Sequence, residues 1–233
     1  MSKKIGAIIQ ARMSSQRLPH KVLYKISNKP MLQYLLERIN HCNRLDGLVV
    51  TTSTDTSDDA IEEYCAKNGI ECHRGALNDV AGRFSQVLNI YRYDGFVRVN
   101  GDSPLLDQRL IDKGISLFLR EDFDIVTNLF PRSYPKGQSV EVLKTSTFQK
   151  AYQSMREADD LEHVTQFFYK NEADFRIHNF SLTANLNNIQ LSVDTKEDLD
   201  LFIEIISSFT RPHWEYTLED ILKIFRELRP RNT

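Results

Sequence analysis

The sequence has few of the features that mark disulfide-bonded, zinc-binding or membrane proteins. It contains 3 cysteines among 233 residues, and none of them shows C-x-x-C spacing. An odd number of thiols without that spacing argues against a disulfide framework and a structural zinc site. No apolar run reaches the roughly 18 residues of a membrane span, and the amino terminus has no apolar signal core. We therefore expect a soluble, cytoplasmic protein.

A charge excess of one sign is missing as well. The 30 basic and 32 acidic residues leave a formal net charge of −2. This balance provides no general attraction to nucleic acid or to an anionic membrane, so neither is expected as a partner. The glycine-rich signatures G-x-x-x-x-G-K-[ST] and G-x-G-x-x-G are also absent. Their absence argues against a Walker loop and a dinucleotide fingerprint.

Short apolar runs and amphipathic patterns alternate along the first hundred residues. The apolar runs predict strands at 5–9, 48–50, 70–73 and 96–99. Between them, amphipathic patterns predict helices, one beginning at Pro30 and one capped by Ser57. This alternation predicts an α/β fold with a doubly wound, mostly parallel sheet, and the length fits a single domain over residues 1–233.

Between residues 129 and 180 the pattern is looser and aromatic residues are frequent. We expect an arm or flap there, with a half-buried strand at 140–142 and helices at 148–155 and 161–168. Its aromatic side chains suit a homodimer surface, although a flap folded back onto the domain explains them equally well. After this arm, alternating apolar residues at 189–193 predict a last strand, and two helices follow it.

Polar side chains gather directly behind the first predicted strand. Three cations and two hydroxyls follow it within a short loop: Arg12, Arg17, Lys21, Ser14 and Ser15. Ligands of open parallel sheets bind at the carboxyl ends of the strands. Guanidinium, ammonium and hydroxyl groups are also the donors that bind phosphate oxygens. This loop is therefore predicted to cradle a polyphosphate, and a solvated basic loop is the alternative.

Two aspartates stand at similar positions later in the chain. Asp102 and Asp194 each follow a predicted strand. Magnesium binds to one or two carboxylates and keeps its other ligand positions for water and phosphate oxygens. Both residues are therefore candidate Mg²⁺ ligands, with a helix cap as the alternative role. Asp107 is expected to cap a helix, and Asp198 is expected to be a cap or a surface charge.

Several of these motifs resemble the cytidylyltransferase family that makes CMP-activated acidic sugars. The run I-I-Q-A-R-M-S-S-Q-R-L-P-H-K-V-L and the K-P-M-L after it resemble the opening of that family. The closest resemblance is to its SpsF-type spore-coat polysaccharide branch, which reads Q-A-R where CMP-Kdo and CMP-sialate synthetases usually read P-A-R. G-D-S-P-L resembles the segment with the catalytic aspartate, and S-V-D-T-K-E-D-L resembles the segment that completes the metal site. Matches also occur at 74–84, 135–142 and 161–165.

The resemblance implies a Rossmann-like sheet of the nucleotide-diphospho-sugar transferase type, with an inserted dimerisation arm at about 129–180. It implies Mg²⁺-dependent coupling of CTP to a sugar or sugar acid, with release of pyrophosphate, by a homodimer. The expected catalytic residues are Arg12, Arg17, Lys21 and Asp102, and the expected metal ligands are Asp102 and Asp194. The expected nucleotide contacts are Gln10, Ala11, Arg12, Ser14, Ser15, Arg17, Lys21, Arg74, Arg83, Asn100 and Gly101. The expected sugar contacts are Gly137, Glu141, Glu162 and His163.

Two departures from the family pattern keep other functions open. Ser14 and His20 stand where the family usually has glycine, the residue that adopts a positive φ at low cost. A nucleotide-binding protein without activity is therefore one alternative. The other is a glycosyltransferase of related fold, although its usual D-x-D motif appears at no predicted strand end. No general base is predicted.

Overall fold

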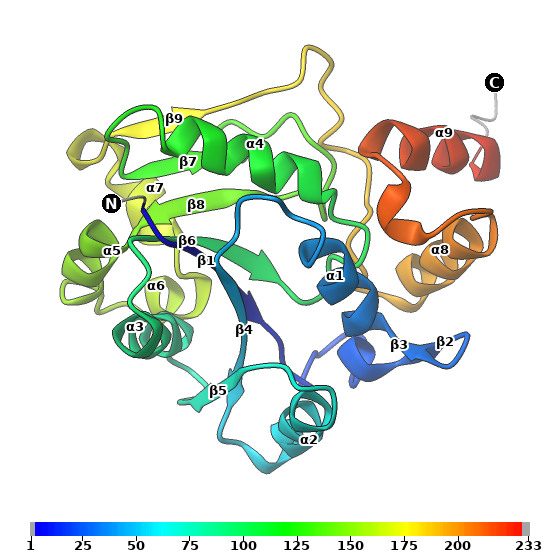
Figure 1. Cartoon of the computed structure of the whole chain (residues 1–233), viewed down its shortest axis with the longest axis horizontal. Helices are drawn as coiled ribbons and strands as arrows, with labels where there is room; N and C mark the ends of the chain where they lie inside the picture. Colours follow the sequence, from blue (N-terminus) through cyan, green and yellow to red (C-terminus); the bar gives the residue numbers. More distant parts are fainter. Residues whose placement is uncertain (1–2, 230–233) are drawn as a thin grey trace.

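The computed structural model describes residues 3–229 and has a seven-stranded sheet at its centre (Figure 1). Its strands, in spatial order, are β5 (Cys72–Gly75), β4 (Gly47–Ser53), β1 (Ile5–Gln10), β6 (Gly95–Asn100), β8 (Glu141–Lys144), β7 (Ile125–Thr127) and β9 (Ile177–Asn179). A separate hairpin is formed by β2 (Lys25–Ile26) and β3 (Lys29–Pro30). In the seven-stranded sheet β8 runs antiparallel to both of its neighbours, and the other pairs are parallel. The predicted α/β fold with a mostly parallel sheet is confirmed.

Helices cover both faces of the sheet (Figure 1). They are α1 (Met31–Ile39), α2 (Asp59–Lys67), α3 (Val80–Tyr91), α4 (Gln108–Phe118), α5 (Thr145–Tyr152), α6 (Ala158–His163), α7 (Gln166–Lys170), α8 (Lys196–Ser207) and α9 (Leu218–Leu228). Successive side chains of β1 alternate between the two faces. Ala7 and Ile9 pack in the core beneath α1 and α4, whereas Ile8 packs in the core beneath α3 and α5. The continuous apolar run of β1 is therefore explained by burial on both faces.

Short side chains fix where several helices begin. Asp107 caps α4 by accepting a hydrogen bond from the Arg109 backbone, and Asp198 joins Thr195 in a capping box at the start of α8. Both residues are thus confirmed as cap residues. Ser57, however, is not a cap. The side chain of Asp55 accepts a hydrogen bond from the Ser57 N–H and starts a 3₁₀ turn, so α2 begins two residues later than Ser57.

The segment expected to form an arm is largely part of the domain. Strand β8 is inserted between β6 and β7, and α5 packs on α3. Because β8 is an interior strand, Val142 and Leu143 are fully buried, so the expected half-buried strand is a buried one. The helix expected at 161–168 is two helices, α6 and α7, separated by Val164 with φ at 54°.

Residues 189–193 alternate like a strand but do not join the sheet. Their backbone groups bond to two loops instead: Leu191 N–H donates to Lys136 O, and Val193 N–H donates to Asp102 O, each at 2.9 Å. Leu191 and Val193, two apolar positions of the alternation, are therefore buried against loops and not within the sheet. Among the described residues, no helix is both long and apolar enough to span a membrane.

Candidate active site

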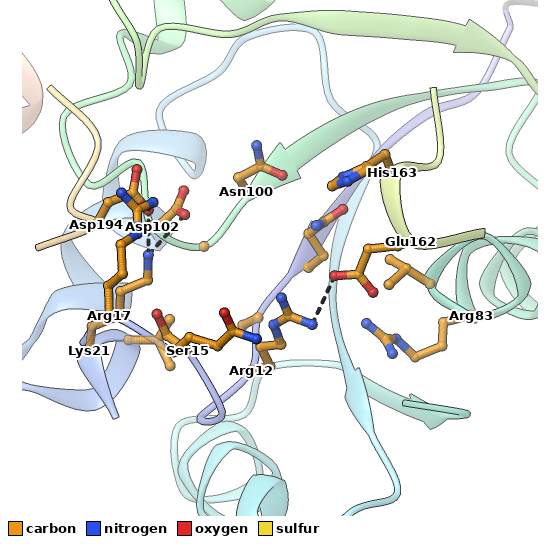
Figure 2. A pocket seen from close by; sticks show the side chains of 16 residues that line it. Arg12, Ser15, Arg17, Lys21, Arg83, Asn100, Asp102, Glu162, His163 and Asp194 are labelled. Carbon is orange, nitrogen blue, oxygen red and sulfur yellow. Dashed lines mark hydrogen bonds and ion pairs between the residues drawn. The ribbon is translucent and has the colours of Figure 1, made fainter. Parts of the chain in front are cut away.

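A cavity of about 570 Å³ opens at the carboxyl ends of β1 and β6 (Figure 2). These strands are parallel neighbours with Gln10 opposite Asn100, so the loops that follow them face each other. Most of the predicted site residues line this cavity: Gln10, Ala11, Arg12, Ser15, Arg17, Lys21, Arg83, Asn100, Gly101, Asp102, Glu162, His163 and Asp194. It is also lined by three residues that were not predicted, Gln16, Val22 and Val80.

Asp102 and Asp194 converge on the ammonium group of Lys21. Lys21 Nζ lies 3.1 Å from Asp102 Oδ2 and 3.0 Å from Asp194 Oδ1. The two aspartates are neighbours because the Val193 N–H donates to the Asp102 carbonyl oxygen. Burial opposes ionisation of Asp194, but Lys21 and Arg17 outweigh this effect and lower its pKa. Asp194 is therefore held as a carboxylate.

This pair of carboxylates fits a magnesium ion that takes its remaining ligands from water or from phosphate oxygens. Among the residues described, no group of three or more His, Cys, Asp and Glu side chains could hold a metal by itself. Magnesium does not need one, since it binds through one or two carboxylates and completes its shell with water and phosphate oxygens. Asp102 and Asp194 supply such a donor set, and the Lys21 ammonium already shows that a cation is stable between them.

At the other end of the cavity, Arg12 pairs with Glu162. Arg12 Nη1 lies 2.8 Å from Glu162 Oε1, and Glu162 is carried by α6 together with His163. Arg83 lies at the same end on α3 (Figure 2). It is buried, and it donates through Nη1 to the carbonyl oxygens of the 76–77 loop. Burial lowers the pKa of Arg83, and nearby carboxylates, including Glu162, oppose this effect.

A buried ion pair supports the floor of the cavity. Arg98 Nη1 donates to Glu141 Oε2 at 2.8 Å, and Arg98 Nε donates to Gln10 Oε1 at 3.1 Å. Tyr169 O–H donates to Glu141 Oε1 at 2.6 Å, and burial and Glu141 raise the pKa of Tyr169. Because arginine can only donate, the Gln10 amide must turn its oxygen toward Arg98 and leave its NH₂ group for the cavity. Arg98 was not predicted as a site residue.

Four of the predicted contacts lie outside the cavity lining: Ser14, Arg74, Gly137 and Glu141. Ser14 is exposed to solvent, and Glu141 lies beneath the floor, bonded to Arg98. Arg74, on β5, donates to Ser53 O and pairs with Asp59 and Glu62 at 2.7 Å each. The structure therefore gives Arg74 a role at the junction of the sheet edge and α2.

Gly137 lies outside the cavity lining and packs against the backbone of residues 191–192. It has φ at 87°, and a Cβ atom there would lie 2.5 Å from the Ser192 nitrogen. Only glycine therefore lets the 135–138 loop approach the segment that leads to Asp194.

The loop from Arg12 to Lys21 is anchored by a residue that sequence reasoning missed. Asp58 is fully buried and accepts hydrogen bonds from Met13 N–H at 2.7 Å and Ser53 N–H at 3.1 Å. The loop closes where His20 N–H donates to Met13 O at 2.9 Å. His20 has φ at 61°, the conformation that glycine adopts cheaply, whereas Ser14 is not among the described residues with positive φ. Ser14, the first departure from the family pattern, therefore has an ordinary backbone conformation. His20, the second departure, keeps the positive φ that a glycine would adopt.

Comparisons with known proteins agree on one family. The sequence profile described as Cytidylyltransferase matches residues 6–226. The uncharacterized protein MJ1063 of Methanocaldococcus jannaschii is 36% identical over 208 residues, which cover 88% of this chain and 84% of that protein. The spore coat polysaccharide biosynthesis protein SpsF of Bacillus subtilis is 30% identical over 200 residues, with 83% and 82% covered.

A shorter match and a solved structure point the same way. The 8-amino-3,8-dideoxy-manno-octulosonate cytidylyltransferase of Shewanella frigidimarina is 33% identical over 131 residues, or 53% of this chain and 52% of that enzyme. A cytidylyltransferase structure from Leptospira borgpetersenii superposes with a TM-score of 0.92 at 29% identity. It covers 97% of this chain, and 95% of that chain is covered in return.

Proposed function

This chain belongs to the cytidylyltransferase family, and on that premise we propose that it couples CTP to a sugar or sugar acid, with Mg²⁺, and releases pyrophosphate. The observation that carries the proposal is the convergence of Arg12, Arg17 and Lys21 with Asp102 and Asp194 on one cavity at the carboxyl ends of β1 and β6. The product would be a CMP-activated sugar for surface polysaccharide or glycan synthesis. We propose that this enzyme acts in the cytoplasm, where CTP is available to it.

Transfer of a nucleotidyl group requires charge neutralisation and alignment more than a covalent nucleophile. Asp102 and Asp194 would hold Mg²⁺, which when bound supplies positive charge beside the phosphate oxygens. Arg12, Arg17 and Lys21 each face the cavity while paired with a carboxylate, and phosphate oxygens can replace those partners. Their charge then stabilises the departing pyrophosphate.

The second substrate would bind at the end of the cavity that holds Glu162, His163 and the NH₂ group of Gln10. Carboxylate, imidazole and amide groups together can bind the hydroxyls and the carboxylate of a sugar acid. The names of the Shewanella and Bacillus relatives favour an acidic sugar used for a polysaccharide. We propose this class of acceptor and a homodimeric enzyme.

The function can be tested by incubating the protein with each of the four NTPs, Mg²⁺ and a panel of sugar acids that includes 3-deoxy-manno-octulosonate. Pyrophosphate release that requires CTP and a sugar acid is the expected result. Release of a nucleoside diphosphate from a nucleotide sugar would instead indicate a glycosyltransferase. CTP binding without turnover across the panel would favour the non-catalytic alternative.

A further inference from the structure

The charged side chains of the cavity form two separate groups (Figure 2). Arg17 and Lys21 share Asp102 and Asp194 at one end. At the opposite end the Glu162 carboxylate lies between the guanidinium groups of Arg12 and Arg83 (Figure 2). An anion flanked by two arginines marks a place where negative charge is stabilised.

Not every N–H group of the Arg83 guanidinium has a hydrogen-bond partner among the described residues. Its side chain is buried, and within residues 3–229 it forms no ion pair within 4.0 Å. Its Nη1 donates to the 76–77 loop, but its Nε is buried without a hydrogen-bond partner among the described residues. A buried guanidinium in this state favours an anion at the cavity end that it lines.

The ion pair between Arg12 and Glu162 can be broken at low cost, so another anion can replace Glu162. The two side chains are 45% and 30% exposed, so the pair is screened by water and contributes little to stability. Arginine can bond to two oxygens of a carboxylate or of a phosphate with the same forked geometry, but a terminal phosphate carries more negative charge than one carboxylate and therefore binds more strongly. A ligand phosphate can therefore replace the Glu162 carboxylate between the two guanidinium groups.

We propose that Glu162 is a displaceable counter-ion of an anion subsite formed by Arg12 and Arg83, and that the terminal phosphate of the nucleoside triphosphate takes its place while Arg17 and Lys21 hold the phosphate next to it. The inference rests on the proposed function, since it assigns part of CTP to this subsite. Once displaced, Glu162 remains on α6 beside His163 and still faces the cavity. Its carboxylate is then free to accept hydrogen bonds from the second substrate, so the nucleotide binds first.

The test is calorimetric titration of CTP, pyrophosphate and CMP, each with Mg²⁺ at one fixed concentration, into wild type and Glu162→Gln. Glutamine keeps the shape of the side chain but gives up the charge that competes with phosphate. We expect CTP and pyrophosphate to bind roughly three- to tenfold more tightly to Glu162→Gln, and CMP to bind unchanged because it lacks outer phosphates. Arg12→Met should weaken the same two ligands by about tenfold or more.

Glu157→Gln is the matched control, because it removes one negative charge beside the same helix from an exposed residue outside the cavity. It should change none of the three affinities, and thermal melts should show all variants folded. Weaker or unchanged CTP binding by Glu162→Gln would overturn the inference, as would an equal gain for CMP, and both results leave the proposed function standing. Wild-type protein that binds neither CTP nor pyrophosphate would overturn the proposed function itself.

Discussion

Asp102 and Asp194 lie side by side because a backbone hydrogen bond joins the two loops that carry them. Asp102→Asn removes charge at the proposed metal position but hardly changes volume, so we expect a stable protein whose kcat falls by about 10²- to 10³-fold. Asp194→Asn should also raise the Mg²⁺ concentration that gives half-maximal rate. Steady-state pyrophosphate release measures both effects.

Near-normal kcat in Asp102→Asn would rule out a metal role for this residue. If Asp194→Asn left the magnesium dependence unchanged, Asp194 would be only the ion-pair partner of Lys21 and Arg17.

Arg17 is more exposed to solvent than Arg12 and Lys21, the other two cations of its loop. Its Nη2 lies 3.3 Å from Asp194 Oδ1. If it holds the outer phosphates, Arg17→Ala should weaken CTP binding by about tenfold and CMP binding far less. Arg17→Lys keeps the charge without the forked geometry, so an intermediate loss is expected. Titrations of both nucleotides at fixed Mg²⁺ provide the comparison. Equal losses for CTP and CMP would show that Arg17 does not contact the outer phosphates.

His20 adopts a left-handed backbone at the end of the same loop, outside the cavity lining. Left-handed backbone costs a residue with a side chain about 1–2 kcal/mol, and glycine avoids that cost but loses about 0.4–1 kcal/mol through its more flexible unfolded state. His20→Gly should therefore change the free energy of unfolding by less than about 1 kcal/mol. His20→Val should destabilise by about 1–2 kcal/mol, because a β-branched residue tolerates this backbone worst. Urea unfolding of the two variants tests the difference, and equal stabilities would contradict it.

At the scale of elements, α1 is fixed to the carboxyl-terminal part of the chain by two buried side chains. Arg38 is fully buried and donates to the carbonyl oxygens of Leu106, His213 and Tyr216. His213 lies in the 3₁₀ turn before α9, and its Nε2 lies 2.7 Å from Glu37 Oε2 on α1. These contacts hold the start of α4 and the turn at 213–215 against the same helix.

The burial of the His213 imidazole makes stability depend on pH. Burial lowers the pKa of His213 to about 4, and the hydrogen bond to Glu37 opposes this only in part. The unfolded chain, with a histidine pKa of about 6.5, binds more protons between these two values, so folding is disfavoured as the pH falls. This contribution is complete above about pH 6.5 and lost by about pH 4, and it amounts to roughly 3 kcal/mol.

Urea unfolding measured across this pH range should show that slope in wild type. His213→Gln has no titrating ring and should show a flatter profile in the same window. A slope that is equal in both proteins would mean that His213 does not titrate on unfolding.

At the scale of the whole molecule, the prediction of a homodimer stays open. Much of the aromatic content of 129–180 is explained by the core, since Phe148, Phe168 and Phe180 are buried within the chain. The dimer therefore depends on the family resemblance, with the segment at 129–180 as its expected contact. Light scattering at micromolar concentration should give twice the mass of 27.1 kDa. A measured mass equal to that of one chain would contradict the prediction of a homodimer.

Local patterns predicted much of this molecule. Residues that are close in sequence decide where apolar runs become strands, where Asp107 caps a helix and which polar groups follow a strand end. Because the carboxyl ends of parallel strands meet at one edge of the sheet, the loop from Arg12 to Lys21 and Asp102 could be assigned to one site in advance.

The partners of these residues were decided only by the tertiary structure. Asp58 anchors Met13 across 45 positions, Arg98 finds Glu141 across 43, and Lys21 reaches Asp194 across 173. The spacing of apolar residues in the sequence does not predict such contacts, because they depend on how strands β1, β6 and β8 are ordered in the sheet. The same physics explains the missing strand at 189–193: alternation records which side chains are buried, but the available backbone partners decide whether a buried segment becomes a strand.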